Sequence, residues 1–191
     1  DDLSSVYIGA RQSRFGIEGE ANTKVGHIRT YMEVDFASTT SSFWRLRHAY
    51  AEWDYFKIGH TWSTFMDNAS LPTTVEFEGP NSSLSKRHGL IRYERKYGEQ
   101  SIVGVSIEAP VSDYFNPADS LLEGKNKQGN FDIAGRYKHL QKWGHVQLAG
   151  IFRRIDYLND DHIDELYGWG ILLSSVYKLN EKNTFYTQYS L

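Results

Sequence analysis

Segments of alternating apolar and polar residues recur along the chain, and the connections between them alternate between short and long. Residues 27–36 (HIRTYMEVDF) show the alternation most clearly. Mainly apolar side chains from Ile28 to Phe36 occupy every second position, and polar or charged ones such as Arg29 and Glu33 occupy the others. Because successive side chains of a β-strand point to opposite faces, a period of two predicts a strand with one apolar and one polar face. The pattern predicts an all-β fold.

The order of the predicted strands and their connections indicates an architecture. Strands are predicted at residues 11–20, 27–36, 44–53, 56–63, 89–96, 101–109, 130–138, 145–154, 167–178 and 184–191. The connections are short at 22–26, 54–55, 97–100, 140–144 and 179–183, and longer and polar at 37–43, 64–88, 110–129 and 155–166. Tight turns at one end and long loops at the other are typical of an antiparallel up-and-down transmembrane β-barrel of the porin type.

The composition excludes several classes of protein. Lys and Arg number 21 and Asp and Glu 24, so the chain has no basic excess for nucleic acid. Cysteine is absent, which excludes disulfides and thiolate chemistry. The 7 histidines are scattered without ligand spacing, so neither a metal nor a cofactor is expected. The most apolar run, GWGILL at residues 168–173, is far shorter than the roughly 18 residues of a membrane-spanning helix.

Alternation alone leaves open which medium each face of the strands meets. In a soluble barrel the apolar face packs inward, whereas in an outer-membrane barrel it contacts lipid and the polar face lines an aqueous lumen. Tyr and Trp near the predicted strand ends, and charges of both signs in mid-strand, favour the membrane arrangement. Glycines on the apolar faces would also fill a soluble core poorly. We therefore expect Ile28, Met32, Val34 and Phe36 to face lipid.

The polar face of the predicted barrel carries a row of arginines. Arginine stays charged at physiological pH and offers a planar fork to carboxylates, and rings of Arg or Lys in a pore select anions. In the alternative interpretation, each arginine pairs with a neighbouring acid and only stabilises the wall. Strand 44–53 is ambiguous, because a β-bulge there would change which residues share a face. The predicted channel-lining residues are Arg14, Arg29, Glu33, Arg45, Arg47, Arg92, Glu94, Arg136 and Arg153.

The longest connection, residues 64–88, differs from the other loops. It contains three Pro or Gly residues, several acids and more apolar residues than a free surface loop needs. Loops of more than about 12–15 residues without internal structure tend to be functional or disordered. Folded into a barrel, this loop would pack on the wall and narrow the pore. Its predicted constriction residues are Asp67, Glu76, Phe77 and Glu78.

Several segments in a fixed order resemble the DcaP-like family of Gram-negative outer-membrane porins. The resemblance is close over residues 11–95, and it rests on RQSRFGIEGE (11–20), RLRHAYAEW (45–53), IGHTWSTFMD (58–67), EFEGP (76–80) and IRYER (91–95). It implies a homotrimer of 16-stranded barrels in the bacterial outer membrane, surrounded by its lipid, with the third loop folded inward. It also implies that small anionic solutes such as dicarboxylates pass through the channel.

The chain departs from this family pattern in one respect. The inward loop of such porins follows the fifth strand, whereas the long loop at 64–88 follows the fourth predicted strand. The chain also stops at FYTQYSL, within a predicted strand. We interpret residues 1–191 as a single transmembrane barrel domain that is incomplete at both ends. A complete ten-stranded barrel is the alternative architecture.

Two other functions remain as alternatives to a channel. Ten-stranded outer-membrane proteases of the omptin type use an Asp-x-His pair and an Asp-x-Asp pair. Asp160 and His162 have the first spacing, but no Asp-x-Asp occurs in the chain, and the Gly-x-Ser-x-Gly motif of many esterases is also missing. A soluble lipocalin-like carrier would need about eight strands and a more apolar interior. The sequence therefore favours a channel, with no enzymatic activity expected.

Overall fold

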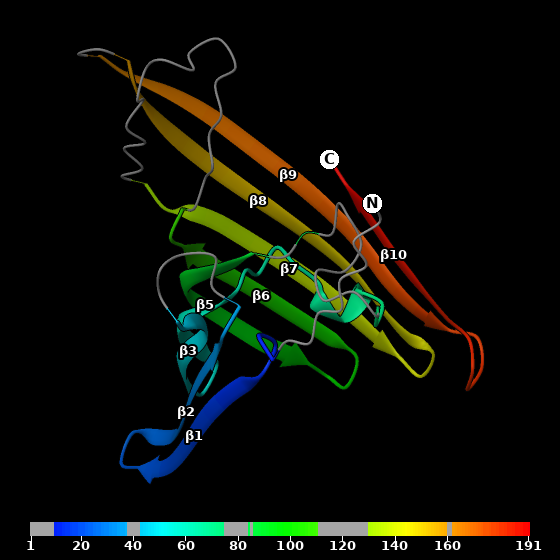
Figure 1. Cartoon of the computed structure of the whole chain (residues 1–191). Helices are drawn as coiled ribbons and strands as arrows, with labels where there is room; N and C mark the ends of the chain where they lie inside the picture. Colours follow the sequence, from blue (N-terminus) through cyan, green and yellow to red (C-terminus); the bar gives the residue numbers. More distant parts are fainter. Residues whose placement is uncertain (1–9, 38–42, 75–83, 85, 111–129, 160–161) are drawn as a thin grey trace, which may run out of the picture.

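The computed structural model describes residues 10–37, 43–74, 84, 86–110, 130–159 and 162–191. They form one sheet in which neighbours in sequence are also neighbours in the sheet, from β1 at one edge to β10 at the other (Figure 1). All strand pairs are antiparallel, so the predicted all-β, up-and-down arrangement is confirmed. The strands are β1 (Arg14–Thr23), β2 (Gly26–Asp35), β3 (Arg45–Trp53), β4 (Phe56–Trp62), β5 (Arg87–Tyr97), β6 (Ser101–Glu108), β7 (Asp132–Gln141), β8 (Gly144–Asn159), β9 (His162–Lys178) and β10 (Thr184–Ser190).

One helical turn interrupts the succession of strands. The 3-10 helix η1 (Asn68–Ser70) lies in the connection between β4 and β5 and packs against β9 and β10. In Figure 1 it stands in front of the sheet, away from the strands that precede and follow it. Within the described ranges, no helix is long and apolar enough to cross a membrane.

The predicted strands coincide with the observed ones except at some ends, and one predicted loop is wrong. Residues 155–166 were expected to connect two strands, but β8 continues to Asn159 and β9 begins at His162, with pairing from Ile155–Leu166 to Asn159–His162. The polar residues there predicted a loop. In the structure, Arg154 on β8 bonds to Glu165 on β9, so charge pairing across the strands continues the ladder.

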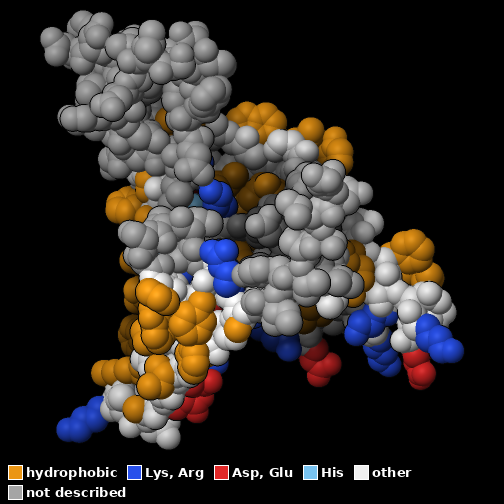
Figure 2. Space-filling model, in the orientation of Figure 1, with side chains coloured by type: hydrophobic (Ala, Val, Ile, Leu, Met, Phe, Trp, Pro, Cys, Tyr) orange, Lys and Arg blue, Asp and Glu red, His pale blue; other side chains and the backbone are white. Residues whose placement is uncertain are grey.

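The two faces of the sheet have opposite chemical character. Large apolar side chains are exposed on the outer face, and charged or polar side chains are buried on the inner face, the reverse of a soluble barrel. Figure 2 shows hydrophobic side chains along the sides of the molecule and charged ones towards its lower end. Exposed outer residues include Ile17, Met32, Ile58, Ile91, Val105, Ile107, Leu148 and Ile171, and buried inner residues include Asp35, Arg47, Arg92, Glu108, Asp132, Gln147 and Ser174.

Aromatic side chains gather at both ends of the outer face. At the long-loop end of β1–β3, the rings of Phe15 and Phe36 lie 5.7 Å apart and those of Phe36 and Trp44 lie 5.4 Å apart. At the short-turn end, Phe56 and Tyr93 have centroids 5.4 Å apart. Two such bands are typical of the girdles that outer-membrane barrels place at the two membrane interfaces.

A β-bulge in β3 decides which arginines face inward. The register with β2 pairs Glu33 with His48 and then Val34 with Leu46, so Arg47 is the extra residue. The shift lets Arg45 and Arg47 both reach the buried Asp35, while Leu46 stays exposed on the outer face. A bulge re-aims side chains locally, as the ambiguous alternation of this strand had indicated.

Gly144 at the start of β8 provides a test of the turn geometry. Its φ is 142°, and an added Cβ would lie 1.9 Å from the carbonyl oxygen of Val176. Gly144→Ala is therefore expected to destabilise the barrel by about 2–3 kcal/mol, through backbone strain and steric overlap. Gly168→Ala is the control, because a Cβ there meets nothing within 4 Å. The measurement is the temperature at which the folded, faster-migrating band disappears in gel electrophoresis. Equal temperatures for the two variants would contradict the prediction.

Candidate functional site

The chain leaves β4 and turns onto the inner face of the sheet; residues 63–71 are named the inward segment. The backbone N–H of Thr64 donates to Glu108 Oε1 at 2.7 Å, and Ser106 Oγ donates to the same oxygen at 2.7 Å. Arg92 Nε donates to Thr64 Oγ1 at 2.7 Å and its Nη2 donates to the carbonyl of Trp62. Buried side chains from β5 and β6 thus fix the start of the inward segment.

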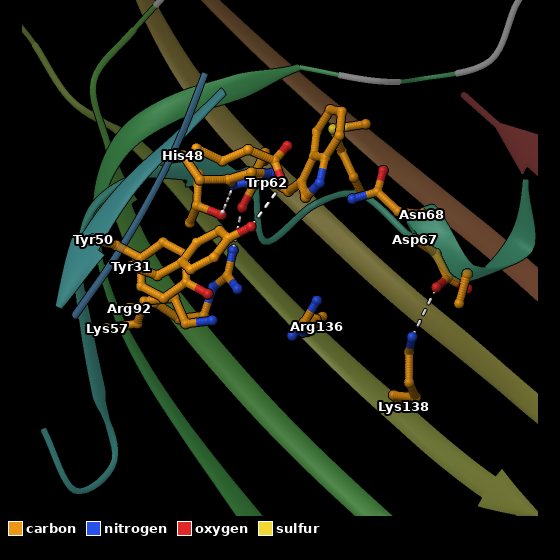
Figure 3. A pocket seen from close by; sticks show the side chains of 15 residues that line it. Tyr31, His48, Tyr50, Lys57, Trp62, Asp67, Asn68, Arg92, Arg136 and Lys138 are labelled. Atoms are coloured by element: carbon orange, nitrogen blue, oxygen red, sulfur yellow. Dashed lines mark hydrogen bonds and ion pairs between the residues drawn. The ribbon is translucent and has the colours of Figure 1, made fainter. Parts of the chain in front are cut away.

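Asp67 fixes the segment to three further strands. Its carboxylate accepts a hydrogen bond from Lys138 Nζ of β7 at 2.7 Å (Figure 3). It also accepts hydrogen bonds from His145 Nε2 of β8 at 2.6 Å and from Ser174 Oγ of β9 at 2.8 Å. Gln188 of β10 donates to the backbone carbonyl of Asp67 at 3.3 Å. We name Asp67, Lys138, His145 and Ser174 the Asp67 cluster. It joins the inward segment to strands far from it in sequence.

The surroundings of Asp67 stabilise its charged form. Burial by itself raises the pKa of the carboxyl, but the hydrogen bonds from Lys138, His145 and Ser174 outweigh burial and hold the pKa below its ordinary value of 3.8. A carboxyl whose pKa is lowered by folding contributes stability above its unfolded pKa, and that contribution is lost as the pH falls through the folded value. Asp67 is therefore charged at neutral pH.

The lowered pKa of Asp67 gives a prediction for the pH dependence of stability. The difference in thermal unfolding temperature between wild type and Asp67→Asn should persist from about pH 7 to about pH 5. It should shrink as the pH falls from 3.8 through the lower pKa of the folded carboxyl, because the carboxyl gains a proton there and loses its attraction to Lys138. Unfolding temperatures measured for both proteins across this range test it. A difference that grows on acidification would contradict the assignment.

A cavity of about 410 Å³ lies between the inward segment and the inner faces of β2–β5 and β7. Figure 3 shows Arg92 beside Tyr31 and Tyr50, with Arg136 apart from them and Lys138 farther along, next to Asp67. Four cationic side chains line the cavity against two carboxylates. The cations are Lys57, Arg92, Arg136 and Lys138, and the carboxylates are Glu33 and Asp67.

A second cavity of about 520 Å³ lies nearer the short turns. Its lining includes Arg29, Arg92 and Glu94, so Arg92 borders both cavities. Trp53 and Phe56 also border it, with ring centroids 6.2 Å apart. The two cavities follow the inner face from the inward segment towards the turn end of the sheet.

Most of the arginines that the sequence singled out are paired with acids on the same face. The pairing supports the alternative interpretation for these residues, in which they stabilise the wall. The pairs are Arg29 with Glu18 and Glu52, Arg45 with Asp35, Arg47 with Glu33 and Asp35, Arg136 with Glu94, and Arg153 with Asp132. Arg14 lies directly opposite Asp35 in the register of β1 and β2.

Arg92 differs from these arginines. It is 5% exposed, and its hydrogen-bond partners are the hydroxyl of Thr64 and the carbonyl of Trp62, both of them neutral. No carboxylate forms an ion pair with it among the residues that the structure describes. Its charge therefore remains available to the two cavities it borders.

Some of the channel-lining and constriction residues predicted from the sequence lie together around the first cavity, and others do not. Glu33, Asp67, Arg92 and Arg136 meet around the cavity of about 410 Å³. Arg14, Arg45, Arg47 and Arg153 do not line that cavity. The predicted constriction residues Glu76, Phe77 and Glu78 lie outside the described residues.

Sequence reasoning missed Lys138, His145, Ser174, Thr64 and Glu108. One signal was present. His145 and Gln147 occupy alternate positions in β8 and point to one face of the strand, whereas the apolar Val146 and Leu148 point to the other face. Polar side chains on the inner face suggest a partner there, but the sequence does not say which. Across the described ranges, no group of three or more His, Asp or Glu side chains is arranged to hold a metal ion.

Comparisons with known proteins agree with this architecture. The crystal structure of the outer membrane channel DcaP of Acinetobacter baumannii superposes with a TM-score of 0.79 and 22% sequence identity, over 90% of this chain and 49% of that chain. At this identity the likeness shows the fold alone, and the chain spans about half the length of that channel. A comparison with curated proteins gives no significant match. The model of the family described as DcaP outer membrane protein matches residues 2–191. The chain therefore belongs to the DcaP outer membrane protein family, which resides in the bacterial outer membrane.

Proposed function

We propose that the protein forms a water-filled channel for small anionic solutes such as dicarboxylates, and that it is not an enzyme. The observation that carries the proposal is the cavity of about 410 Å³ on the inner face, which is bordered by Arg92, an arginine without a carboxylate partner among the described residues. The other cations that line it, Lys57, Arg136 and Lys138, are ion-paired with Glu52, Glu94 and Asp67. A polar inner face behind an apolar outer face is the organisation of a porin wall. A soluble carrier, one of the alternatives from sequence, conflicts with the family's place in the outer membrane.

The inward segment is proposed as the constriction of this channel. It lies against the inner face, where Asp67 and Thr64 are bonded to β5–β9, and it borders the cavity. Since the Debye length at physiological salt is about 8 Å, a solute in a narrow pore is poorly screened from charges on its wall. A carboxylate would therefore respond to Arg92, and a dianion would respond twice as strongly.

The assembly is also a proposal. By the resemblance, we infer 16-stranded barrels associated as a homotrimer and surrounded by outer-membrane lipid. The structural likeness to half of a DcaP channel chain supports the barrel. Native mass spectrometry of the full-length protein in detergent would give the number of subunits directly. A monomeric mass under conditions that preserve folded barrels would contradict the trimer.

The test of the function is electrical. Full-length protein in planar bilayers should conduct, and its zero-current potential in a KCl gradient should indicate preference for chloride over potassium. Replacing chloride with succinate on one side should leave a measurable anion current. A channel that prefers potassium, or one closed to succinate, would contradict the anion-channel proposal. If the protein gives no current in planar bilayers but cleaves peptides, the omptin-like alternative is favoured instead.

A further inference from the structure

Arg95 is a cation on the apolar outer face. It lies opposite Val103 of β6 in the register of β5 and β6. Val103 is an exposed apolar residue, and so is Ile91, whose side chain is on the same face of β5 as that of Arg95. It lies two residues before the end of β5 at Tyr97, close to the short turn that contains Gly98. A charged side chain in this position is close to the membrane interface rather than the midplane.

Tyrosines surround the Arg95 guanidinium. Its Cζ lies 5.2 Å from the ring centroid of Tyr55 and 5.4 Å from that of Tyr97. The ring of Tyr93 lies 5.8 Å from that of Tyr55 and completes the group of tyrosines. No carboxylate is ion-paired with Arg95 in the part of the chain that the structure describes. Cation–π contacts hold the guanidinium in place but leave its charge uncompensated. The group is therefore oriented and still has N–H donors for an anion.

Hydroxyl groups extend this polar spot across β6 and β7. Ser101 lies opposite Tyr97, and its Oγ lies 3.1 Å from the hydroxyl of Tyr137. Tyr137 in turn lies opposite Val103, the neighbour of Arg95. The outer face thus presents one guanidinium with several hydroxyls beside it, a set of donors suited to phosphate oxygens.

The outer face offers a contrasting arginine at its other end. Arg154 of β8 follows the exposed Phe152 on the same alternate positions, and it is bonded to Asp156 at 2.8 Å and to Glu165 at 2.6 Å. Its charge is neutralised within the protein. Arg95 therefore differs from Arg154 in the feature that matters for binding an external anion.

Membrane energetics indicate what neutralises Arg95. An arginine on the lipid face costs about 2–4 kcal/mol at the midplane but only about 0–1 kcal/mol near the interface, where its long side chain reaches the headgroups. Aromatic contacts mark that interface at the same end of the sheet, including Trp143 and Tyr177 with centroids 5.1 Å apart. Short turns of outer-membrane barrels face the periplasm. We propose that Arg95, framed by Tyr55, Tyr93 and Tyr97, binds the phosphate of an anionic glycerophospholipid in the periplasmic leaflet.

Lipid titration followed by native mass spectrometry tests this proposal. Full-length protein is purified in mild detergent and titrated with phosphatidylglycerol. Arg95→Gln should bind it about tenfold more weakly, because a charge-assisted bond to phosphate is lost. Arg154→Gln is the matched control and should bind like wild type. Arg95→Lys, which keeps the charge but loses the planar fork, should bind with intermediate strength. Gel mobility of unheated samples confirms that each variant is folded.

Two further comparisons distinguish the source of the phosphate. Phosphatidylcholine should bind more weakly than phosphatidylglycerol, and inorganic phosphate at equal concentration should not displace the bound lipid. Displacement by inorganic phosphate would overturn the assignment to a lipid. Equal binding by wild type and Arg95→Gln, or an equal loss in Arg154→Gln, would overturn the site itself. These readouts do not involve solute transport and are independent of the proposed channel activity.

Discussion

Asp67→Ala is expected to raise the single-channel conductance, because it releases the inward segment from the wall. The change removes the shared partner of Lys138, His145 and Ser174 and leaves the partly buried ammonium of Lys138 without its ion pair. Breaking a buried ion pair by removing one partner costs about 3–5 kcal/mol. A penalty of that size shifts a docked–undocked equilibrium by more than two orders of magnitude. Planar-bilayer recordings of the full-length protein measure the result.

Asn68 provides the matched control for this experiment. It is adjacent to Asp67 and lies in η1, but its buried Oδ1 has no hydrogen-bond partner among the described residues. Asn68→Ala should therefore leave the conductance close to that of wild type. If Asp67→Ala conducts like Asn68→Ala, the inward segment is held by other contacts or does not restrict the pore.

The double change Arg92→Gln and Arg136→Gln is expected to lower anion preference about tenfold. It removes two of the four cationic side chains around the cavity of about 410 Å³ and frees Glu94 from its ion pair. A unit charge about 6 Å from a solute in water changes its energy by ~0.7 kcal/mol, or roughly threefold in permeability, and two such changes multiply. The zero-current potential in a KCl gradient reports the change.

Arg153→Gln serves as the control for the double change. Arg153 is paired with Asp132 at 2.6 Å and does not line this cavity. We expect its removal to shift the potential much less, since the charge it neutralises lies elsewhere on the wall. Arg153→Gln removes one charge where the double change removes two, so a shift about half as large as that of the double change would mean that selectivity follows the net charge of the lumen rather than the charges around the cavity.

Much of the fold was predictable, because its signals are local. Period-two alternation depends on the geometry of a single strand, so windows such as residues 27–36 indicate both the strand and its two faces. The error at residues 155–166 has a local cause too, since charged residues are common in loops. Here Arg154 and Glu165 lie on neighbouring strands, where opposite charges stabilise pairing.

The candidate site was predictable in kind but not in its contacts. Alternation indicated that Arg29, Arg92 and Arg136 share the polar face, yet it does not indicate which of them is neutralised. Glu18 and Glu52 neutralise Arg29, and Glu94 neutralises Arg136, through register between strands. Arg92 instead holds Thr64 and Trp62 and stays without a carboxylate partner among the described residues. Register is a property of the paired strands, so one strand read alone cannot supply it.

The positions of the strands, the face to which each side chain points and the order of turns and loops are set by residues close together in the sequence, since side-chain direction follows from the dihedral angles of one strand. The Asp67 cluster instead depends on contacts between residues far apart in the sequence. Asp67 meets Lys138, His145 and Ser174, which are 71, 78 and 107 residues away in the chain. Their meeting depends on how the curved sheet brings β7–β9 to the inward segment, and on a connection whose composition does not specify its path. Only the tertiary structure decides such contacts, because it alone sums the registers of all the intervening strands.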